Sequence, residues 1–226
     1  MNKISIYILL IFIYLGLSKS LSPTEQRTPS IKDHWAFSSF FKSAPITVVL
    51  VDAFETGFLI KTYFHKYIVL HAFKTPKTTI VRVSKKFFDV NAKNLGMSLF
   101  RRKDSPDSES SLPIPPGFMY VGDPLFGRWQ YKDSGTKIWS FHRAYRHFPE
   151  TFGWIDFSVS HEFYKKIKQA FTDHQVFYGT NNEFGTNGSV TKKYLNNMSF
   201  NTRRKSLTEQ TKNHLLNFMS LPWGKK

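Results

Sequence analysis

The sequence of 226 residues contains no cysteine. The chain therefore cannot form a disulfide, a zinc-thiolate site or a cysteine nucleophile. Disulfides are common in oxidising compartments, but only small domains depend on them, so their absence is compatible with export. The absence of cysteine favours a bacterial protein over a eukaryotic extracellular one.

The sequence also lacks an apolar run that is long enough to cross a membrane. The N-terminal run, Ile4 to Leu17, has 14 residues, whereas a spanning helix needs about 20. Lys3 precedes this run, and the small residues Ser18 and Ser20 follow it, which is typical of a secretory signal peptide. The sequence predicts a signal peptide at 1–20, cleaved after Ser20, and a flexible leader at 21–30. An uncleaved anchor is the alternative.

Acidic residues are scarce: 16 Asp and Glu face 32 Lys and Arg, a formal net charge of +16. Removal of residues 1–20 takes away Lys3 and Lys19 and leaves +14. Such a charge predicts a negatively charged partner. Outside the cytoplasm this partner is an anionic envelope polymer or a membrane surface, and no dedicated binding of nucleic acid is expected. A basic surface without a dedicated ligand is the alternative.

The charge is concentrated in a basic C-terminal segment, 190–226, which carries eight Lys or Arg and one acid, Glu209. Within it, residues 206–219 have the spacing of an amphipathic helix. The residues expected to meet an anionic surface are Lys192, Lys193, Arg203, Arg204 and Lys205.

Motifs of known catalytic chemistry are missing. The sequence has neither a Gly-x-Ser-x-Gly elbow nor a Ser-x-x-Lys motif. His161, Glu162 and His174 lack the His-x-x-x-His spacing of a helical metal site, so no metal and no cofactor are expected. A glycan hydrolase needs two facing carboxylates. Glu183, in a loop rich in Gly and Asn, could pair with Glu150 or Glu162, and whether the protein is an enzyme stays open.

Residues 31–100 are predicted to be rich in β-structure. Short apolar and β-branched runs, separated by Gly or Pro, indicate strands at 46–54, 58–64, 67–73 and 78–83. The connections between them are too short for crossover helices, so an antiparallel meander is expected. A helix is predicted over 85–99. Residues 101–117, charged and rich in Ser and Pro, are predicted to form an exposed loop or linker.

Residues 118–189 form an aromatic-rich part that contains a predicted hairpin. Asp133-Ser134-Gly135 fits a three-residue turn with Gly in the left-handed position. That turn places Trp129 opposite Trp139, with Tyr131 and Phe141 on the same face. An exposed aromatic face of this kind suits glycan binding, with Trp129 and Trp139 as ligands of the sugar rings. The alternative is that these rings belong to the core.

A cluster of basic residues follows the hairpin. On a helix, His142 would share a face with Arg146, and Arg143 would share the next face with His147. The arginines could clamp a phosphate or carboxylate. The alternative is that these cations pair with Asp123, Asp156 or Glu150. A second helix, capped by Ser158 or Ser160, is predicted to run to Phe171.

Together these features predict an α+β protein: an N-terminal antiparallel β-meander, an aromatic-rich hairpin, and two or three helices. The leading hypothesis is an exported, periplasmic or extracellular, bacterial cell-envelope protein that binds an anionic polymer or membrane surface. The alternatives are an envelope glycan hydrolase around Glu183 and a membrane-active protein that uses its C-terminal helix. The ligand and the oligomeric state stay open.

Overall fold

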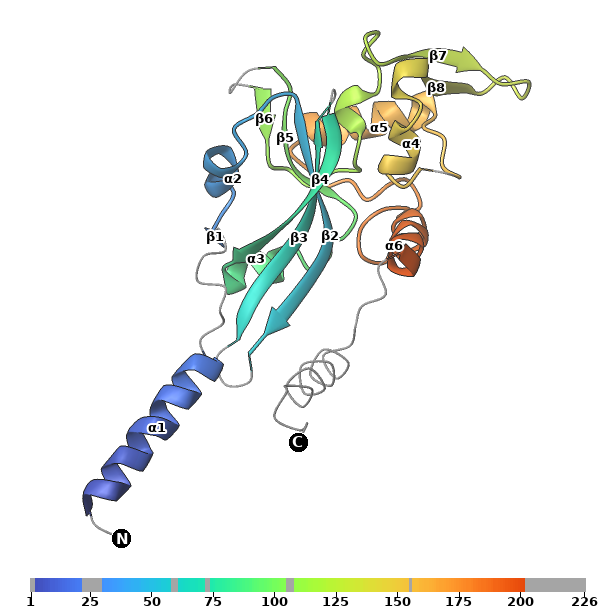
Figure 1. Ribbon diagram of the computed structural model, residues 1–226. Coiled ribbons are helices and arrows are strands. Elements are labelled where there is room, and N and C mark those ends of the chain that lie inside the picture. Colours follow the sequence, from blue (N-terminus) through green and yellow to red (C-terminus); the bar gives the residue numbers. More distant parts are fainter. Residues whose placement is uncertain are drawn as a thin grey trace, which may run out of the picture.

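The computed structural model describes residues 3–21, 30–57, 61–71, 74–104, 108–154 and 156–201 (Figure 1). It confirms the α+β class, with about one third of the residues in helices and one third in strands. The main element is a curled sheet of six strands in the order β1-β4-β3-β2-β5-β6.

The centre of the sheet is the predicted antiparallel meander. It consists of β2 (Ile46–Thr56), β3 (Thr62–His71) and β4 (Lys74–Val83). β1 (Ser30–Ile31) adds a short parallel strand beside β4. On the other side, β5 (Ser98–Arg102) pairs with β2, and β6 (Glu109–Ser110) pairs with β5, both antiparallel.

The strand boundaries differ from the prediction: β4 begins at Lys74 instead of 78, and the two middle runs are one strand. The described parts of the two runs expected at 58–64 and 67–73 meet in a single strand, β3, which covers 62–71. Side chains on both faces of the strand are buried between Phe64 and Leu70, because other layers of the protein cover both faces of the sheet. The sequence therefore lacks the alternation that would have marked one continuous strand.

The helix expected over 85–99 is shorter. Ser84 caps α3 (Lys85–Val90) by accepting a hydrogen bond from the Phe87 N–H, 3.2 Å away. The chain then turns through Gly96, whose φ of +75° lies in the left-handed region. Gly96 N donates to Leu50 O at 2.7 Å, which starts the pairing of the following strand, β5, with β2.

The prediction of an exposed linker at 101–117 is wrong for much of that segment. Arg101 and Arg102 are buried in β5, and Ile114 is fully buried and bridged to Ser98. Hydrogen bonds from both guanidinium groups to neighbouring residues make this burial possible, as described below. Charged composition was therefore misleading about exposure.

One face of the sheet is covered by α2 (Trp35–Phe40). Phe37 is fully buried and stacks on Phe100 of β5, with ring centroids 5.6 Å apart. It also meets Tyr67 of β3 edge to face at 5.7 Å. These rings close the core between α2 and the sheet.

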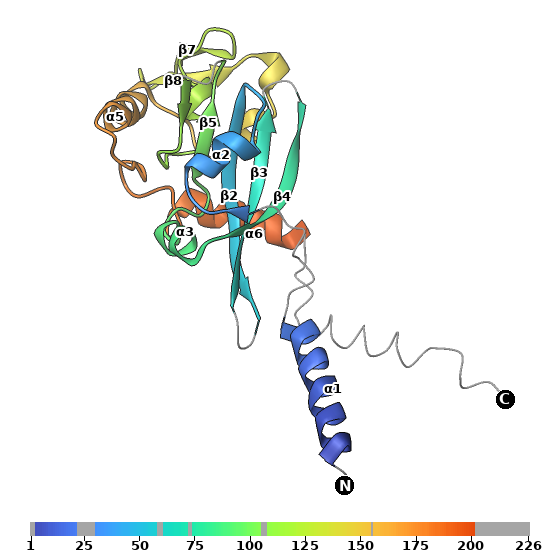
Figure 2. The ribbon, with the colours of Figure 1, turned by 90° about the vertical axis from the view of Figure 1, so that its left-hand side faces the viewer.

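The opposite face is covered by the aromatic-rich part of the chain. In Figures 1 and 2, α2 and α5 lie on different sides of the sheet. The Thr47 hydroxyl of β2 donates to Met119 Sδ, which joins the sheet to this layer. The elements of the layer are η2 (Phe118–Tyr120), β7 (Gly127–Tyr131), β8 (Lys137–Phe141), η3 (Arg143–Tyr145), α4 (Phe148–Thr151) and α5 (His161–Thr172).

Two helices lie at the ends of the described chain. α1 (Lys3–Leu21) stands apart from the sheet in Figure 1, and its side chains are exposed from Lys3 to Tyr14. None of the described helices combines the length and the apolar composition needed to span a membrane. α6 (Ser189–Asn201) begins the basic C-terminal segment. The helix expected at 206–219 lies outside the described residues, as do residues 22–29 of the leader expected at 21–30.

Candidate anion-binding surface

The β7–β8 hairpin forms as its sequence predicts. Gly135 adopts a φ of +74°, the left-handed conformation that glycine reaches without a Cβ clash. Lys132 N donates to Thr136 O at 3.0 Å and Gly135 N to Lys132 O at 2.8 Å, which closes the three-residue turn. The resulting register pairs Trp129 with Trp139.

The tryptophan face of the hairpin turns inward. Trp139 is 7% exposed. Trp129 is half-buried and touches His161 and Tyr164 of α5, with ring centroids 4.9 and 5.5 Å away. Trp139 therefore cannot stack on a glycan, and the predicted exposed aromatic face does not form. Tyr131, at the end of β7, is the ring of this face that remains 74% exposed.

Segment 142–147 is not one helix. His142 has an extended backbone, with φ −64° and ψ 158°, and precedes the three-residue turn η3, so the helical faces predicted for Arg143, Arg146 and His147 do not form. His142 Nε2 lies 3.0 Å from Pro124 O. A carbonyl can only accept, so Nε2 carries the proton and His142 holds the loop rather than a ligand. The side chains of all four residues are nevertheless exposed.

The hairpin and this turn, residues 127–147, form a basic surface, which we call the hairpin surface. It contains one acid, Asp133. Lys137 Nζ lies over the Tyr131 ring, 5.7 Å from its centroid. The side chains of the other four cations are exposed, as are those of the neighbouring His142 and His147. The five cations of the hairpin surface are Arg128, Lys132, Lys137, Arg143 and Arg146.

Two of the three acids expected to neutralise Arg143 and Arg146 bind lysines elsewhere. Asp123 accepts from Lys103 Nζ at 2.8 Å, and this hydrogen bond lowers the pKa of Asp123. Asp156 pairs with Lys193 of α6. Within the described parts of the chain, neither arginine has an ion-pair partner. The predicted pairing with Asp123, Asp156 or Glu150 is therefore wrong, and the two arginines stay available to an external anion.

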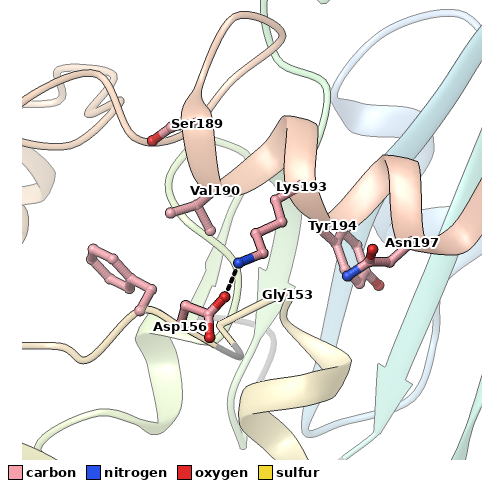
Figure 3. Close-up of a pocket in the computed structure, with 8 residues that line it drawn as sticks. Gly153, Asp156, Ser189, Val190, Lys193, Tyr194 and Asn197 are labelled. Atoms are coloured by element: carbon pink, nitrogen blue, oxygen red, sulfur yellow. Dashed lines mark hydrogen bonds and ion pairs between the residues drawn. The ribbon is translucent and has the colours of Figure 1, made fainter.

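A small cavity of about 210 Å³ lies between α6 and the chain around Gly153 (Figure 3). Figure 3 shows Lys193 reaching across it to the Asp156 carboxylate. Tyr194, beside it on α6, donates its hydroxyl to Thr151 O at 3.0 Å, which fastens the helix to α4. Lys193 was expected to face an anionic surface, but it already has a carboxylate partner.

The remaining basic residues of the C-terminal segment are only partly described. Lys192 is exposed on α6. Arg203, Arg204 and Lys205 lie outside the described residues. The hairpin surface is a basic surface whose geometry the structure describes, and the binding residues predicted from the sequence do not include its Arg128, Lys132 or Lys137. Their signal was the ratio of five cations to one acid in 21 residues.

The carboxylates proposed for glycan hydrolysis are occupied or exposed. Glu183 accepts from Asn181 N at 2.9 Å and from Asn181 Nδ2 at 3.3 Å, so its carboxylate closes its own loop. Glu150 and Glu162 are exposed in the first turns of α4 and α5. In the described segments no group of three His, Asp or Glu side chains could hold a metal ion.

Comparison with family models, with curated proteins and with solved structures finds no match to this chain.

Proposed function

We propose that this is an exported bacterial cell-envelope protein that binds an anionic polymer or membrane surface through the hairpin surface. The observation that carries the proposal is that Arg143 and Arg146 are exposed and have no ion-pair partner among the described residues, while Asp123 and Asp156 are bound to lysines. Exposed, unpaired cations keep their attraction for external anions, because no internal carboxylate cancels their field.

The charge balance of the described body supports the same proposal. From residue 30 to 201, the described residues include 23 Lys and Arg but 13 Asp and Glu. Even if every one of these acids paired with one cation, ten of the 23 cations would remain without a partner among the described acids. Near an anionic membrane each such cation contributes about 1 kcal/mol of attraction.

The binding test compares two double charge reversals. Arg143→Glu with Arg146→Glu alters the hairpin surface, and Lys74→Glu with Lys77→Glu makes the same change of charge on exposed residues of β4. Cosedimentation is measured with isolated cell walls, with vesicles containing anionic lipid, and with neutral vesicles. We expect the hairpin variant to bind at least tenfold more weakly, and the β4 variant to lose much less.

Two comparisons decide whether the hairpin surface is the docking site and what it binds: low against high salt, and cell walls against vesicles. Binding should weaken strongly between low salt and about 0.5 M salt, because screening then shortens to a few ångströms. Binding that persists at high salt, or equal loss in the two double variants, would refute the hairpin surface as the docking site. A preference for cell walls over vesicles identifies the polymer, and the reverse identifies the membrane.

Export is tested separately. Expression of the full chain in a bacterium, followed by fractionation and N-terminal sequencing, should yield a protein that begins at Leu21 outside the cytoplasm. An intact N-terminus on a cytoplasmic protein would refute export while leaving the charge argument unchanged.

A further inference from the structure

A second cavity, of about 560 Å³, lies away from the hairpin surface. Its walls come from the residue before α2, the end of α3, the chain from β6 onward, and residues 174–178. Polar groups without charge alternate there with apolar side chains. None of the described residues that line it is an acid, a Lys or an Arg; the lining includes His34, Asn94, Ser110, His174, Val176 and Tyr178.

A buried cation lies directly behind this cavity. Arg101 is 4% exposed and is the cross-strand partner of Ser110, to whose Oγ it donates at 3.0 Å. Its other bonds go to Leu112 O at 2.8 Å, to Ser98 O and to Ser98 Oγ. All these partners are neutral, and among the described residues Arg101 has no carboxylate. Burial lowers the pKa of Arg101 to about 9, so the guanidinium is still charged at neutral pH.

The neighbouring cross-strand pair has the counter-charge that Arg101 lacks among the described residues. Arg102 and Glu109 are the next cross-strand partners on the same two strands, and they form an ion pair at 2.7 Å. Arg101 faces a serine where Arg102 faces a glutamate. A buried charge without a counter-charge is costly, so the region around Arg101 favours the arrival of an anion.

Ser110 links Arg101 to the cavity, because it accepts a hydrogen bond from Arg101 and also lines the cavity. Its Oγ accepts from Arg101 and also from Leu112 N at 3.3 Å, which occupies both lone pairs. Ser110 Oγ donates to no acceptor in the described structure, so its proton is free for a ligand in the cavity that it lines. A hydroxyl whose oxygen accepts from a cation is a stronger donor, because hydrogen bonds in a chain polarise one another.

A chain of amides supplies further donors. The Tyr178 hydroxyl donates to Asn94 Oδ1 at 2.9 Å, Asn94 Nδ2 donates to Asn91 Oδ1 at 3.0 Å, and Asn91 Nδ2 donates to Phe87 O at 2.9 Å. Asn94 Nδ2 and Asn91 Nδ2 each carry a second hydrogen that takes no part in these hydrogen bonds. The acids next to the two histidines, Asp33 and Asp173, do not line the cavity.

We propose that this cavity binds a small organic oxyanion, either the phosphate monoester of a polyol or a polyol that carries a free carboxylate, with the oxyanion at the Ser110 hydroxyl. A free phosphate ion would fill a small part of about 560 Å³. The body of the ligand lies against Val90 and Val176, which are partly exposed at the rim, and hydrogen-bonds to the amide chain. This site is independent of the hairpin surface.

The test uses the full chain and isothermal titration calorimetry in about 0.15 M salt, which screens contacts at the surface. The probes are glycerol 1-phosphate, inorganic phosphate and glycerol. We expect one saturable site for glycerol 1-phosphate and at least tenfold weaker binding of glycerol. Ser110→Ala should weaken the phosphate ester about tenfold, the change that loss of one charge-assisted hydrogen bond gives. Ser111→Ala, which removes the adjacent hydroxyl, should change it less than threefold.

Two further variants keep the test decisive. Val176→Trp fills the cavity but leaves Arg101 and Ser110 intact, so it should abolish binding even if Ser110→Ala proves unstable. Arg143→Glu with Arg146→Glu should have no effect. Glycerol binding as tightly as its phosphate, unchanged binding in Ser110→Ala, or loss of binding in the hairpin variant alone would each overturn the proposal. So would the absence of a saturable site.

Discussion

Trp129 and Trp139 lie directly opposite each other on β7 and β8, with their rings in T-shaped contact at a centroid distance of 5.1 Å. Trp139 also meets Phe141 edge to face at 6.2 Å. Its backbone N–H donates to Val159 O at 2.9 Å, just before α5. The hairpin is therefore held by its tryptophan face, and the cations that it carries are presented by a packed element.

Replacement of Trp139 tests this attachment. Trp139→Ala removes a large buried ring, so we expect a loss of about 3–5 kcal/mol in the free energy of unfolding. Tyr131→Ala removes a ring of the same face that is 74% exposed and should change stability by less than about 0.5 kcal/mol. Urea unfolding followed by tryptophan fluorescence and circular dichroism measures both. Equal effects of the two substitutions would contradict the inward orientation of the tryptophan face.

The cap of α5 distinguishes two serines that the sequence left equivalent. Ser160 Oγ accepts from Phe163 N at 3.1 Å, whereas Ser158 is exposed and lies outside the helix. Ser160→Ala should cost about 1 kcal/mol of stability, because the first turn of the helix loses an acceptor. Ser158→Ala should be nearly neutral. Thermal unfolding of the two matched variants measures the difference, and a larger effect at Ser158 would show that the helix starts earlier.

Local signals in the sequence predicted the hairpin well. The turn chemistry of Asp133-Ser134-Gly135 fixes the register, and the register fixes which side chains share a face. The same applies to α5, whose serine cap and apolar spacing lie within one segment. These elements are encoded by residues close together in the chain, so a single sequence suffices to predict them.

Pairing between distant segments was not predictable in this way. β5 and β6 were interpreted as part of a helix and of a linker, since Arg101 and Arg102 resemble surface residues. Their burial depends on partners elsewhere: Arg102 NH1 donates to Phe41 O at 2.6 Å, across 61 residues. The cavity beside Arg101 likewise joins residues from 34 to 178. No local pattern marks contacts of this kind.

The Arg102–Glu109 pair provides a test of buried charge. The Arg102 side chain is 8% exposed, and Glu109 Oε2 accepts from both its Nε and its NH2. Glu109→Gln leaves the guanidinium without its counter-charge and should lower the free energy of unfolding by about 2–4 kcal/mol. Asp89→Asn breaks the exposed Lys85–Asp89 pair on α3, which should cost less than about 0.5 kcal/mol. Comparable losses in urea unfolding would show that Arg102 is not buried as described.

His65 links stability to pH. It is fully buried in β3, with Nδ1 2.9 Å from the Tyr67 hydroxyl, and its Nε2 has no hydrogen-bond partner within the described structure. Burial lowers the pKa of His65 to about 4. An unfolded chain binds this proton near pH 6.5, so between pH 6.5 and 4 the unfolded state binds more protons than the folded one. Stability should therefore be unaffected by His65 above pH 6.5 and fall by up to about 3 kcal/mol as the pH drops to 4.

His65→Gln isolates this contribution, because glutamine keeps a polar side chain of similar size but does not titrate. The variant should be less stable than the native protein at pH 7, where a packed core residue has been replaced. Its free energy of unfolding should nevertheless fall less steeply from pH 6.5 to 4, since one proton-binding difference between the states is gone. His147→Gln changes an exposed histidine and should leave the native slope intact. If the His65 and His147 variants keep the same slope as the native protein, the acid sensitivity of this fold arises elsewhere than at the buried imidazole.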